Sequence, residues 1–269
     1  MTSDAIISLQ RVSVTYRSGP AWNRRVVHAV RGVDIAIPRG TILGLVGESG
    51  SGKTTVGRLC LGLLRPTEGA VLFDHAPMPK PRAIKGRAAV VLQQPEWALN
   101  PRLRVGTSVA EPLTVLGIAK AERLERAREA LSQVGLDPSL LTRYPHELSG
   151  GQRQRASIAR ALITDPSFVV FDEAVSALDV SVQTQILNLI RSLQETRAFS
   201  ALFISHDLAA TRYVADRIAV MRLGEIVDTA DADRFYALPE HPYSRELWST
   251  LMPADLAPEI AARPAETLS

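Results

Sequence analysis

A chain of 269 residues with 46% hydrophobic and 22% charged residues has the balance of a globular protein, and it can hold one large domain with an inserted subdomain. The net charge of +3 comes from basic and acidic residues mixed along the sequence, which argues against a nucleic-acid-binding surface. The single cysteine, Cys60, excludes an internal disulfide framework and a four-cysteine metal or iron–sulfur site. It is expected to be a small core residue.

The N-terminus has neither the basic start nor the apolar stretch of a signal peptide. No run approaches the roughly eighteen apolar residues that a membrane-spanning helix requires. Any role at a membrane is therefore expected to come through a partner.

Short apolar runs rich in β-branched and aromatic residues predict buried parallel strands at 41–46, 168–171 and 201–204. Helical patterns alternate with these runs, which predicts an α/β fold. Two runs with alternating apolar positions, 6–16 and 26–37, predict a smaller antiparallel sheet near the N-terminus.

Between residues 95 and 162 the pattern becomes helical, which predicts an inserted helical subdomain. Its clearest helix is expected at 121–134, with Gly135 as the C-cap and an ion pair between Glu122 and Arg126. The apolar stripe of this helix is formed by Leu124, Ala127, Leu131 and Val134. After Asp231 the pattern is less regular, and residues 253–269 are expected to form a loosely ordered tail rich in Pro and Ala.

A phosphate-binding loop is predicted at 47–54, where the sequence fits the pattern G-x-x-x-x-G-K-[ST]. Its residues are Gly47, Glu48, Ser49, Gly50, Ser51, Gly52, Lys53 and Thr54. The glycines let the backbone wrap so that its N–H groups point at phosphate oxygens. Lys53 is expected to reach the β- and γ-phosphates, and the Thr54 hydroxyl to bind Mg²⁺. A strand precedes the loop, and a helix containing Thr55 is expected to follow it as far as Pro66.

Two acidic residues, Asp172 and Glu173, follow the predicted strand at 168–171. A carboxylate at a strand end can hold Mg²⁺ through water, and we expect Asp172 to do so. The adjacent Glu173 can polarise an attacking water. Alone, this string fits a helix N-cap equally well, but beside a phosphate loop it indicates ATP hydrolysis.

The pentapeptide Leu-Ser-Gly-Gly-Gln at 148–152 resembles the signature motif of the ATP-binding-cassette (ABC) ATPases. Ser149 as N-cap, followed by Gly150, Gly151 and Gln152, makes a helix start whose N–H groups can meet a phosphate. The resemblance implies that this phosphate is held by a second subunit. It also implies a P-loop NTPase fold with a RecA-like parallel sheet core, an N-terminal antiparallel β subdomain and an inserted α-helical subdomain.

Further motifs of the family follow in order. Gln93 resembles the Q-loop glutamine, which senses Mg²⁺ and the γ-phosphate and faces a membrane partner. The resemblance implies that Gln93 is a Mg²⁺ ligand beside Thr54 and Asp172. Asp179 ends the stretch 176–179, which resembles the D-loop at the dimer interface, and His206 resembles the switch histidine that contacts the γ-phosphate.

An aromatic residue near the N-terminus stacks on adenine in this family. Tyr16 resembles that residue, and Trp22 is the alternative.

The resemblance covers about residues 6 to 250 and divides the chain into a cassette at 1–236 and a C-terminal extension at 237–269. Several stretches resemble the ATPases of peptide and nickel importers, namely 47–54, 98–102, 143–148, 179–183 and 241–245. The last contains His241-Pro242-Tyr243, which without the resemblance is simply a turn.

Two departures from the family pattern are present. The usual Asp-Glu-Pro-Thr is Asp-Glu-Ala-Val at 172–175, which keeps both carboxylates. The cysteine-rich tail of many peptide-importer ATPases is missing, so no iron–sulfur site is expected.

The resemblance implies an ATP-hydrolysing subunit that powers a bacterial importer of di- or oligopeptides, with ATP and Mg²⁺ bound and with Lys53, Glu173 and His206 as catalytic residues. Implied partners are a second ATPase subunit, with a heterodimer favoured over a homodimer, two permease subunits and indirectly a solute-binding protein, at the cytoplasmic face of the plasma membrane. Nickel, metal–chelate or opine import stays open, as does a soluble ATPase of the phosphonate-breakdown type, which shares the His-Pro-Tyr segment. An exporter subunit is disfavoured because no membrane segment is fused.

Overall fold

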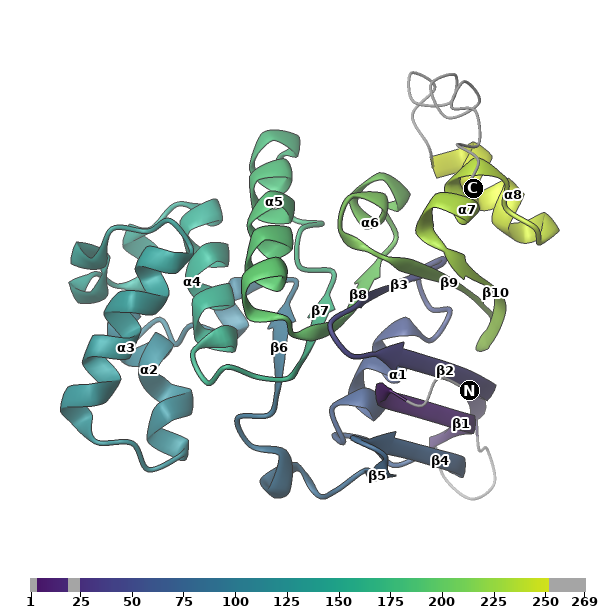
Figure 1. Cartoon of the computed structure of the whole chain (residues 1–269), viewed down its shortest axis with the longest axis horizontal. Coiled ribbons are helices and arrows are strands. Elements are labelled where there is room, and N and C mark those ends of the chain that lie inside the picture. Colours follow the sequence, from purple (N-terminus) through teal and green to yellow (C-terminus); the bar gives the residue numbers. More distant parts are fainter. Residues whose placement is uncertain (1–3, 19–24, 252–269) are drawn as a thin grey trace, which may run out of the picture.

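A six-stranded sheet forms the centre of the computed structural model, which describes residues 4–18 and 25–251 (Figure 1). Its strand order is β10-β9-β3-β8-β7-β6, and only β10 is antiparallel to its neighbour. The strands are β3 (Ile42–Val46), β6 (Ala88–Leu92), β7 (Phe168–Asp172), β8 (Ser200–Ser205), β9 (Arg217–Arg222) and β10 (Glu225–Asp231). The three parallel strands predicted from the sequence, now β3, β7 and β8, are confirmed.

A second sheet near the N-terminus is antiparallel, as predicted, and has the strand order β2-β1-β4-β5. Its strands are β1 (Ala5–Ser18), β2 (Arg25–Pro38), β4 (Glu68–Phe73) and β5 (Ala76–Pro77). Helix α1 (Lys53–Cys60) contacts strands of both sheets and contributes Val56, Leu59 and the buried Cys60 to the core between them. Burial raises the pKa of the Cys60 thiol to about 12, as suits a core residue.

Helix α1 ends earlier than the sequence suggested. The predicted helix to Pro66 is wrong, because the chain leaves the helix after Cys60 through Gly62, which has a φ of 65°. The Gly62 N–H donates to the Leu59 carbonyl at 3.0 Å and the Leu63 N–H to the Arg58 carbonyl at 2.9 Å. This pair of hydrogen bonds is the Schellman motif, in which a left-handed glycine ends the helix.

Three helices gather beside one end of the central sheet (Figure 1). They are α2 (Val105–Val115), α3 (Lys120–Gln133) and α4 (Gly150–Leu162), and each contacts the other two. Short 3₁₀ turns at Pro81–Ile84, Pro95–Trp97, Pro138–Thr142 and Pro145–Glu147 connect elements in this half of the chain.

The predicted details of α3 are confirmed except for one apolar position. Arg126 and Glu122 form an ion pair at 2.7 Å, and Gly135 follows the helix with a φ of 70°. Leu124 is 52% exposed, so its place in the buried stripe was wrong. The buried residues of α3 begin at Ala127, about one turn after Leu124, so the N-terminal part of the helix is left exposed.

Four further helices complete the described chain: α5 (Val180–Arg197), α6 (Leu208–Val214), α7 (Ala232–Ala237) and α8 (Pro242–Leu251). The expected irregular course after Asp231 is wrong as far as residue 251, because α7 and α8 fill this segment. The simple turn at 241–243 is wrong too, since Pro242 begins α8, where its missing N–H costs no hydrogen bond. The tail at 253–269 lies outside the described residues.

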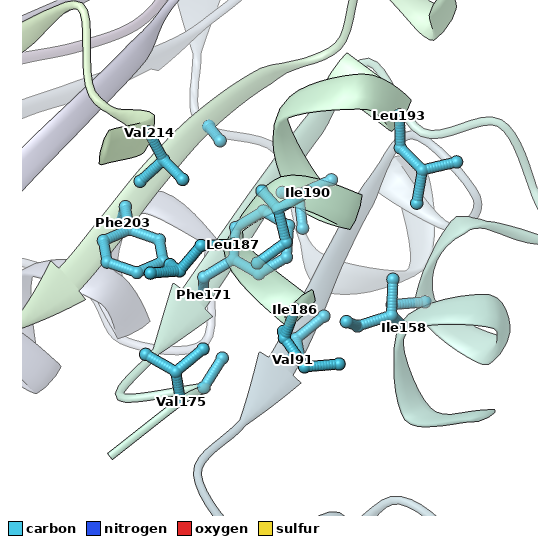
Figure 2. Packing of buried hydrophobic residues seen from close by; sticks show 14 of the residues in the cluster. Val91, Ile158, Phe171, Val175, Ile186, Leu187, Ile190, Leu193, Phe203 and Val214 are labelled. Atoms are coloured by element: carbon cyan, nitrogen blue, oxygen red, sulfur yellow. The ribbon is translucent and has the colours of Figure 1, made fainter. Parts of the chain in front are cut away.

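The core lies on both faces of the central sheet because successive strand residues point to opposite sides. In β7, Phe168 and Val170 pack toward α1 and the antiparallel sheet, whereas Val169 and Phe171 pack toward α4, α5 and α6. Figure 2 shows Phe171 and Phe203 packed against Leu187 and Ile190 of α5. The strands are thus fixed by apolar contacts on each side.

Within residues 4–18 and 25–251, no helix combines the length and the apolar character needed to cross a bilayer.

Phe171→Ala should lower the free energy of unfolding by about 3–5 kcal/mol, because the ring is fully buried between the rings of Phe199 and Phe203. The half-exposed Leu124 is the matched control, and Leu124→Ala should change the free energy of unfolding by less than about 1 kcal/mol. Urea denaturation measures the free energy of unfolding of both variants. Equal losses would contradict the finding that Phe171 is buried and Leu124 is exposed.

Candidate functional site

The predicted phosphate loop connects β3, in the middle of the central sheet, to α1. Gly47 has a φ of 152°, and a Cβ there would lie 2.1 Å from the Met221 carbonyl oxygen. Gly52 has a φ of 113°, and its Cβ would lie 2.2 Å from the Ala29 carbonyl oxygen. The loop is therefore pressed against β9 and β2, and only glycine fits at these two positions.

Lys53 is buried and its ammonium is turned back on the loop. The Nζ atom donates to the Gly47 and Glu48 carbonyl oxygens, both at 2.7 Å. Burial lowers the pKa of Lys53, although the carboxylates of Glu173, Asp172 and Glu48 oppose this effect. A bound phosphate would stabilise the charged form of this buried ammonium, since a phosphate adds negative charge at short range.

The first acidic residue, Asp172, ends β7 beside the start of α1. The Thr54 Oγ1 atom donates to Asp172 Oδ1 at 3.3 Å. Burial raises the pKa of Asp172, and the nearby Glu173 charge adds to the rise, whereas the Thr54 hydroxyl, Arg58 and Lys53 lower it. Two of the three predicted Mg²⁺ ligands, Thr54 and Asp172, are therefore brought together.

The second acidic residue, Glu173, has a φ of 52°, an uncommon backbone conformation for a residue other than glycine. Its N–H donates to the Ile204 carbonyl of β8 at 3.0 Å, which fixes it beside the central strands. Its Oε1 atom lies 3.6 Å from His206 Nδ1. Glu173 and His206 therefore come together from the ends of two adjacent strands, as predicted for one site.

Gln93 joins this group through a residue that sequence analysis assigned only to the D-loop. Gln93 Nε2 donates to Ser176 Oγ at 3.1 Å, and Ser176 Oγ donates to the Glu173 carbonyl at 3.0 Å. The loop after β7 is also held from α4, because the buried Gln154 Nε2 donates to the Ala174 carbonyl at 2.7 Å. The D-loop resemblance of Ser176 does not indicate these contacts, and Gln154 lies in no motif identified in the sequence.

The predicted N-cap Ser149 is confirmed at the start of α4, where it also forms a capping box with Gln152. The Gln152 N–H donates to Ser149 Oγ at 3.2 Å, and the Ser149 N–H donates to Gln152 Oε1 at 2.9 Å. A Cβ at Gly150 would meet nothing within 4 Å, whereas one at Gly151 would lie 2.8 Å from Val182. Gly150 thus leaves the helix start open to a ligand, and Gly151 allows α5 to approach.

A cavity of about 550 Å³ lies over the phosphate loop. Its lining includes Ser49, Gly50, Gly52, Lys53, Thr54, Thr55 and Glu173, together with Val26, Val27, His28, Ala29 and Arg31 of β2 and Leu223 and Gly224 after β9. Gly47, Glu48 and Ser51 lie in the same loop but outside this lining. The residues of β2 and of the turn after β9 were missed, because nothing in their local sequence marks them as part of a site.

Tyr16, Ser149 and Asp179 are not part of this cavity lining. Tyr16 is 38% exposed and pairs in the antiparallel sheet with Val27, which does line the cavity. Trp22 lies outside the described residues. Asp179 occupies the N-cap position of α5, is exposed and makes no side-chain capping bond.

The oxygen donors fit a small hard cation such as Mg²⁺. A hydroxyl, Thr54, and a carboxylate, Asp172, lie side by side, with Gln93 and Glu173 bordering the adjoining cavity. In the part of the chain that the structure describes, no group of three or more His, Cys, Asp or Glu residues forms a complete metal cage. Such a partial set suits Mg²⁺, which keeps several waters and takes phosphate oxygens as ligands.

Comparison with known proteins agrees with this arrangement. A match to the ABC transporter family covers residues 30–176. A Brucella ovis protein named "Putative peptide import ATP-binding protein" is 46% identical over 261 residues, covering 95% of this chain and 81% of the relative. The chain belongs to the ABC transporter family. A second relative with the same name, from Brucella abortus, is 50% identical over 235 residues, covering 85% of this ABC protein and 70% of the relative.

Solved structures support the same fold. An ATP-binding cassette solved as a dimer in a post-hydrolysis state with ADP and Pi is 29% identical, with a TM-score of 0.74, and the match covers 84% of this ABC protein and 98% of that chain. A Clostridium perfringens subunit from an ABC transporter complex has a TM-score of 0.79 at 23% identity, covering 96% and 99%, and shows the fold alone. The predicted P-loop fold and nucleotide binding are confirmed, and this ABC protein is an ATPase.

Asp172→Asn should stabilise the nucleotide-free ABC ATPase at neutral pH, because the folded chain must partly bury a charge that is hydrated in the unfolded chain. The raised pKa means that this penalty is absent below the ordinary value of 3.8 and grows as the pH rises through the folded-state value. The gain in free energy of unfolding should therefore be larger at about pH 7 than at about pH 4. Urea denaturation at both pH values measures the gain, and an equal gain at both would contradict the burial of this charge.

Proposed function

We propose that this ATPase powers a bacterial importer of di- or oligopeptides. The observation that carries the proposal is the site around the phosphate loop: Lys53, Thr54 and Glu173 line one cavity, Asp172 contacts Thr54, and His206 contacts Glu173. The signature start at Ser149 neither lines this cavity nor contacts these residues. The names of the Brucella relatives supply the solute class.

Each residue at the phosphate loop has a role that its surroundings support. Lys53 binds the β- and γ-phosphates, because phosphate oxygens can replace the two carbonyl partners of its ammonium. Thr54 and Asp172 hold Mg²⁺, and the metal would neutralise charge on the phosphates when bound. Tyr16, which is paired with Val27 at the cavity edge, is proposed to stack on the adenine.

Glu173 is the proposed general base for the attacking water, and His206 contacts the γ-phosphate from the next strand end. The contact at 3.6 Å allows the imidazole to orient the Glu173 carboxylate. Gln93 reports the state of this site through Ser176, which binds the Glu173 main chain. The Glu173 backbone is thus held from β8 on one side and from Ser176 on the other.

Two subunits are needed for one complete site. Because the capped start of α4 is open at Gly150 but does not line the cavity of its own chain, we propose that it covers a nucleotide bound by the other subunit. Asp179, exposed before α5, lies at the same interface. ATP then adds contacts that exist only in the closed dimer, which is the difference in affinity that a conformational switch requires. A related but different second chain is the favoured partner.

A second cavity is the proposed contact site for the permeases. It has a volume of about 420 Å³, shares Thr54, Asp172 and Glu173 with the catalytic site, and is bordered by Gln93. Trp97, at its rim, is 72% exposed, and Leu63 is exposed as well. Apolar side chains left in water next to Gln93 favour a protein partner there. The ATPase would then lie at the cytoplasmic face of the plasma membrane as a peripheral subunit.

Glu173→Gln should lower kcat for ATP hydrolysis by about 10²- to 10⁴-fold, because the amide cannot accept the proton of the attacking water. Affinity for ATP should stay within about twofold, since Lys53 and the loop are untouched. Phosphate release measures kcat, and Glu195→Gln, on the exposed side of α5, is the control that should retain activity. Retention of most of the activity by the Glu173 variant would exclude this residue as the base.

The importer assignment predicts a stable complex. A tagged Glu173→Gln form, isolated from its native cell in mild detergent with Mg·ATP, should bring down two permease chains and a second ATPase, identified by mass spectrometry. The associated solute-binding protein should bind short peptides and not Ni²⁺ when titrated by calorimetry. A soluble assembly without permeases would favour the phosphonate-breakdown type and contradict import, while the ATPase activity would be unaffected.

A further inference from the structure

A glutamine in the first turn of α5 binds the residue that directly follows His206. Gln183 Nε2 donates to Asp207 Oδ2 at 2.9 Å, and both residues are partly buried. A hydrogen bond to a charged carboxylate is stronger than one between two neutral groups. The bond joins the start of α5 to the start of α6, and these two helices pack against each other.

Asp207 uses each of its polar groups in a hydrogen bond. Its N–H donates to Ser205 Oγ at 2.9 Å, and its carbonyl accepts from Thr211 Oγ1 at 2.7 Å. Its Oδ1 atom accepts from the Ala210 N–H at 3.0 Å and thereby caps α6. The remaining oxygen, Oδ2, is the one that accepts from Gln183. Asp207 and α6 therefore form one unit, which Gln183 ties to α5.

The position of His206 depends on this unit. His206 lies between Ser205, the last residue of β8, and Asp207, so the sheet holds its backbone on one side and the bonds of Asp207 hold it on the other. The imidazole is half-exposed, and its distance of 3.6 Å from Glu173 Oε1 is too long for a strong hydrogen bond. Its direction is therefore determined mainly by the backbone that carries it.

The same turn of α5 contacts the signature segment. Val182 lies so close to Gly151 that a Cβ at this glycine would come within 2.8 Å of its side chain. Helix α5 also begins directly after the stretch 176–179, which is proposed to lie at the subunit interface. A shift of either segment when two subunits close would reach the first turn of α5, and Gln183 would transmit it to Asp207.

We infer that Gln183 is a positioning residue for His206, through which closure of the two subunits places this histidine for hydrolysis. Gln183 acts through Asp207 and does not line the nucleotide cavity. The inference rests on the proposed role of His206 toward the γ-phosphate and on the proposed pair of subunits. It does not depend on which solute is imported.

The first test removes the donor. Gln183→Leu in the full chain should lower kcat for ATP hydrolysis by about 10- to 100-fold, because a displaced catalytic group loses its alignment. The affinity for Mg·ADP, measured by calorimetric titration, should stay within about twofold, since ADP lacks the phosphate that His206 is proposed to contact. Gln185→Leu is the matched control. Gln185 is exposed on the same helix and binds Arg155 of α4 at 3.2 Å, so its loss should leave kcat within about twofold.

The second test reverses the hydrogen bond. Gln183→Glu sets a second carboxylate against Asp207 Oδ2, so kcat should fall at least as far as in Gln183→Leu. Adding Asp207→Asn supplies an amide donor to the new carboxylate, and asparagine caps a helix as well as aspartate does. The double variant should therefore recover kcat to within about threefold of the parent. Absence of this recovery would contradict a role for the bond itself.

The third test shows whether Gln183 acts through the histidine. In a chain that already carries His206→Ala, the further change Gln183→Leu should lower the residual kcat by less than about twofold, because residues that act as one unit are not additive. Unchanged kcat in Gln183→Leu alone, or a loss of full size in the His206→Ala chain, would overturn the inference. Both results would leave the proposed role of His206 intact, because His206→Ala alone tests that role.

Discussion

The lack of space around the phosphate loop is the constraint on which the site depends. The loop leaves β3 in the middle of the sheet and passes between the Met221 and Ala29 carbonyls, where no side chain fits at Gly47 or Gly52. Strands β9 and β2 therefore determine the path of the loop as much as its own sequence does. A loop held so closely brings its N–H groups to a phosphate without first having to become ordered, which favours tight binding.

The catalytic groups meet because parallel strands end at one edge of the sheet. Neighbouring strands β3, β8 and β7 deliver the phosphate loop, His206 and the acidic pair to that edge. Ligands of open α/β sheets bind at the carboxyl ends of the strands for this reason. Burial at this edge also shifts the pKa values of two groups. It raises the pKa of Asp172 and lowers the pKa of Lys53. Because both charged groups are poorly hydrated, Lys53 would be stabilised by a phosphate and Asp172 by a cation more than by water.

The motifs could be predicted from the sequence because each is a short stretch of fixed spacing. The loop at 47–54, the pair at 172–173 and the capped start at Ser149 need only local geometry, and the structure has all three. Strands β6 and β9 were not predicted, although 88–92 and 217–222 are largely apolar, because neither run is flanked by a motif. Pro66 predicts a later helix end than the structure has, because the left-handed Gly62 already ends α1 after Cys60.

Other parts of the site could not be read from the sequence at all. The cavity wall formed by β2 depends on where the antiparallel sheet packs, which is a long-range contact. The same is true of Tyr243, whose ring packs on Arg222, a residue distant in sequence. Local patterns carry no information about such contacts, since tertiary packing decides them.

The hydrogen bond from Gln154 to the Ala174 carbonyl bears on ATP hydrolysis by a subunit that has not joined its partner. Gln154 lies in the helix that begins at the signature, and Ala174 directly follows the proposed base. A tilt of α4 must either carry the Ala174 peptide with it or break a buried bond of 2.7 Å. The direction of the Glu173 carboxylate therefore depends on the orientation of α4, the helix that is proposed to cover the nucleotide of the neighbouring subunit. If a second subunit holds α4 in place as proposed, an unassembled subunit would lack the orientation of Glu173 that hydrolysis needs and would hydrolyse little ATP.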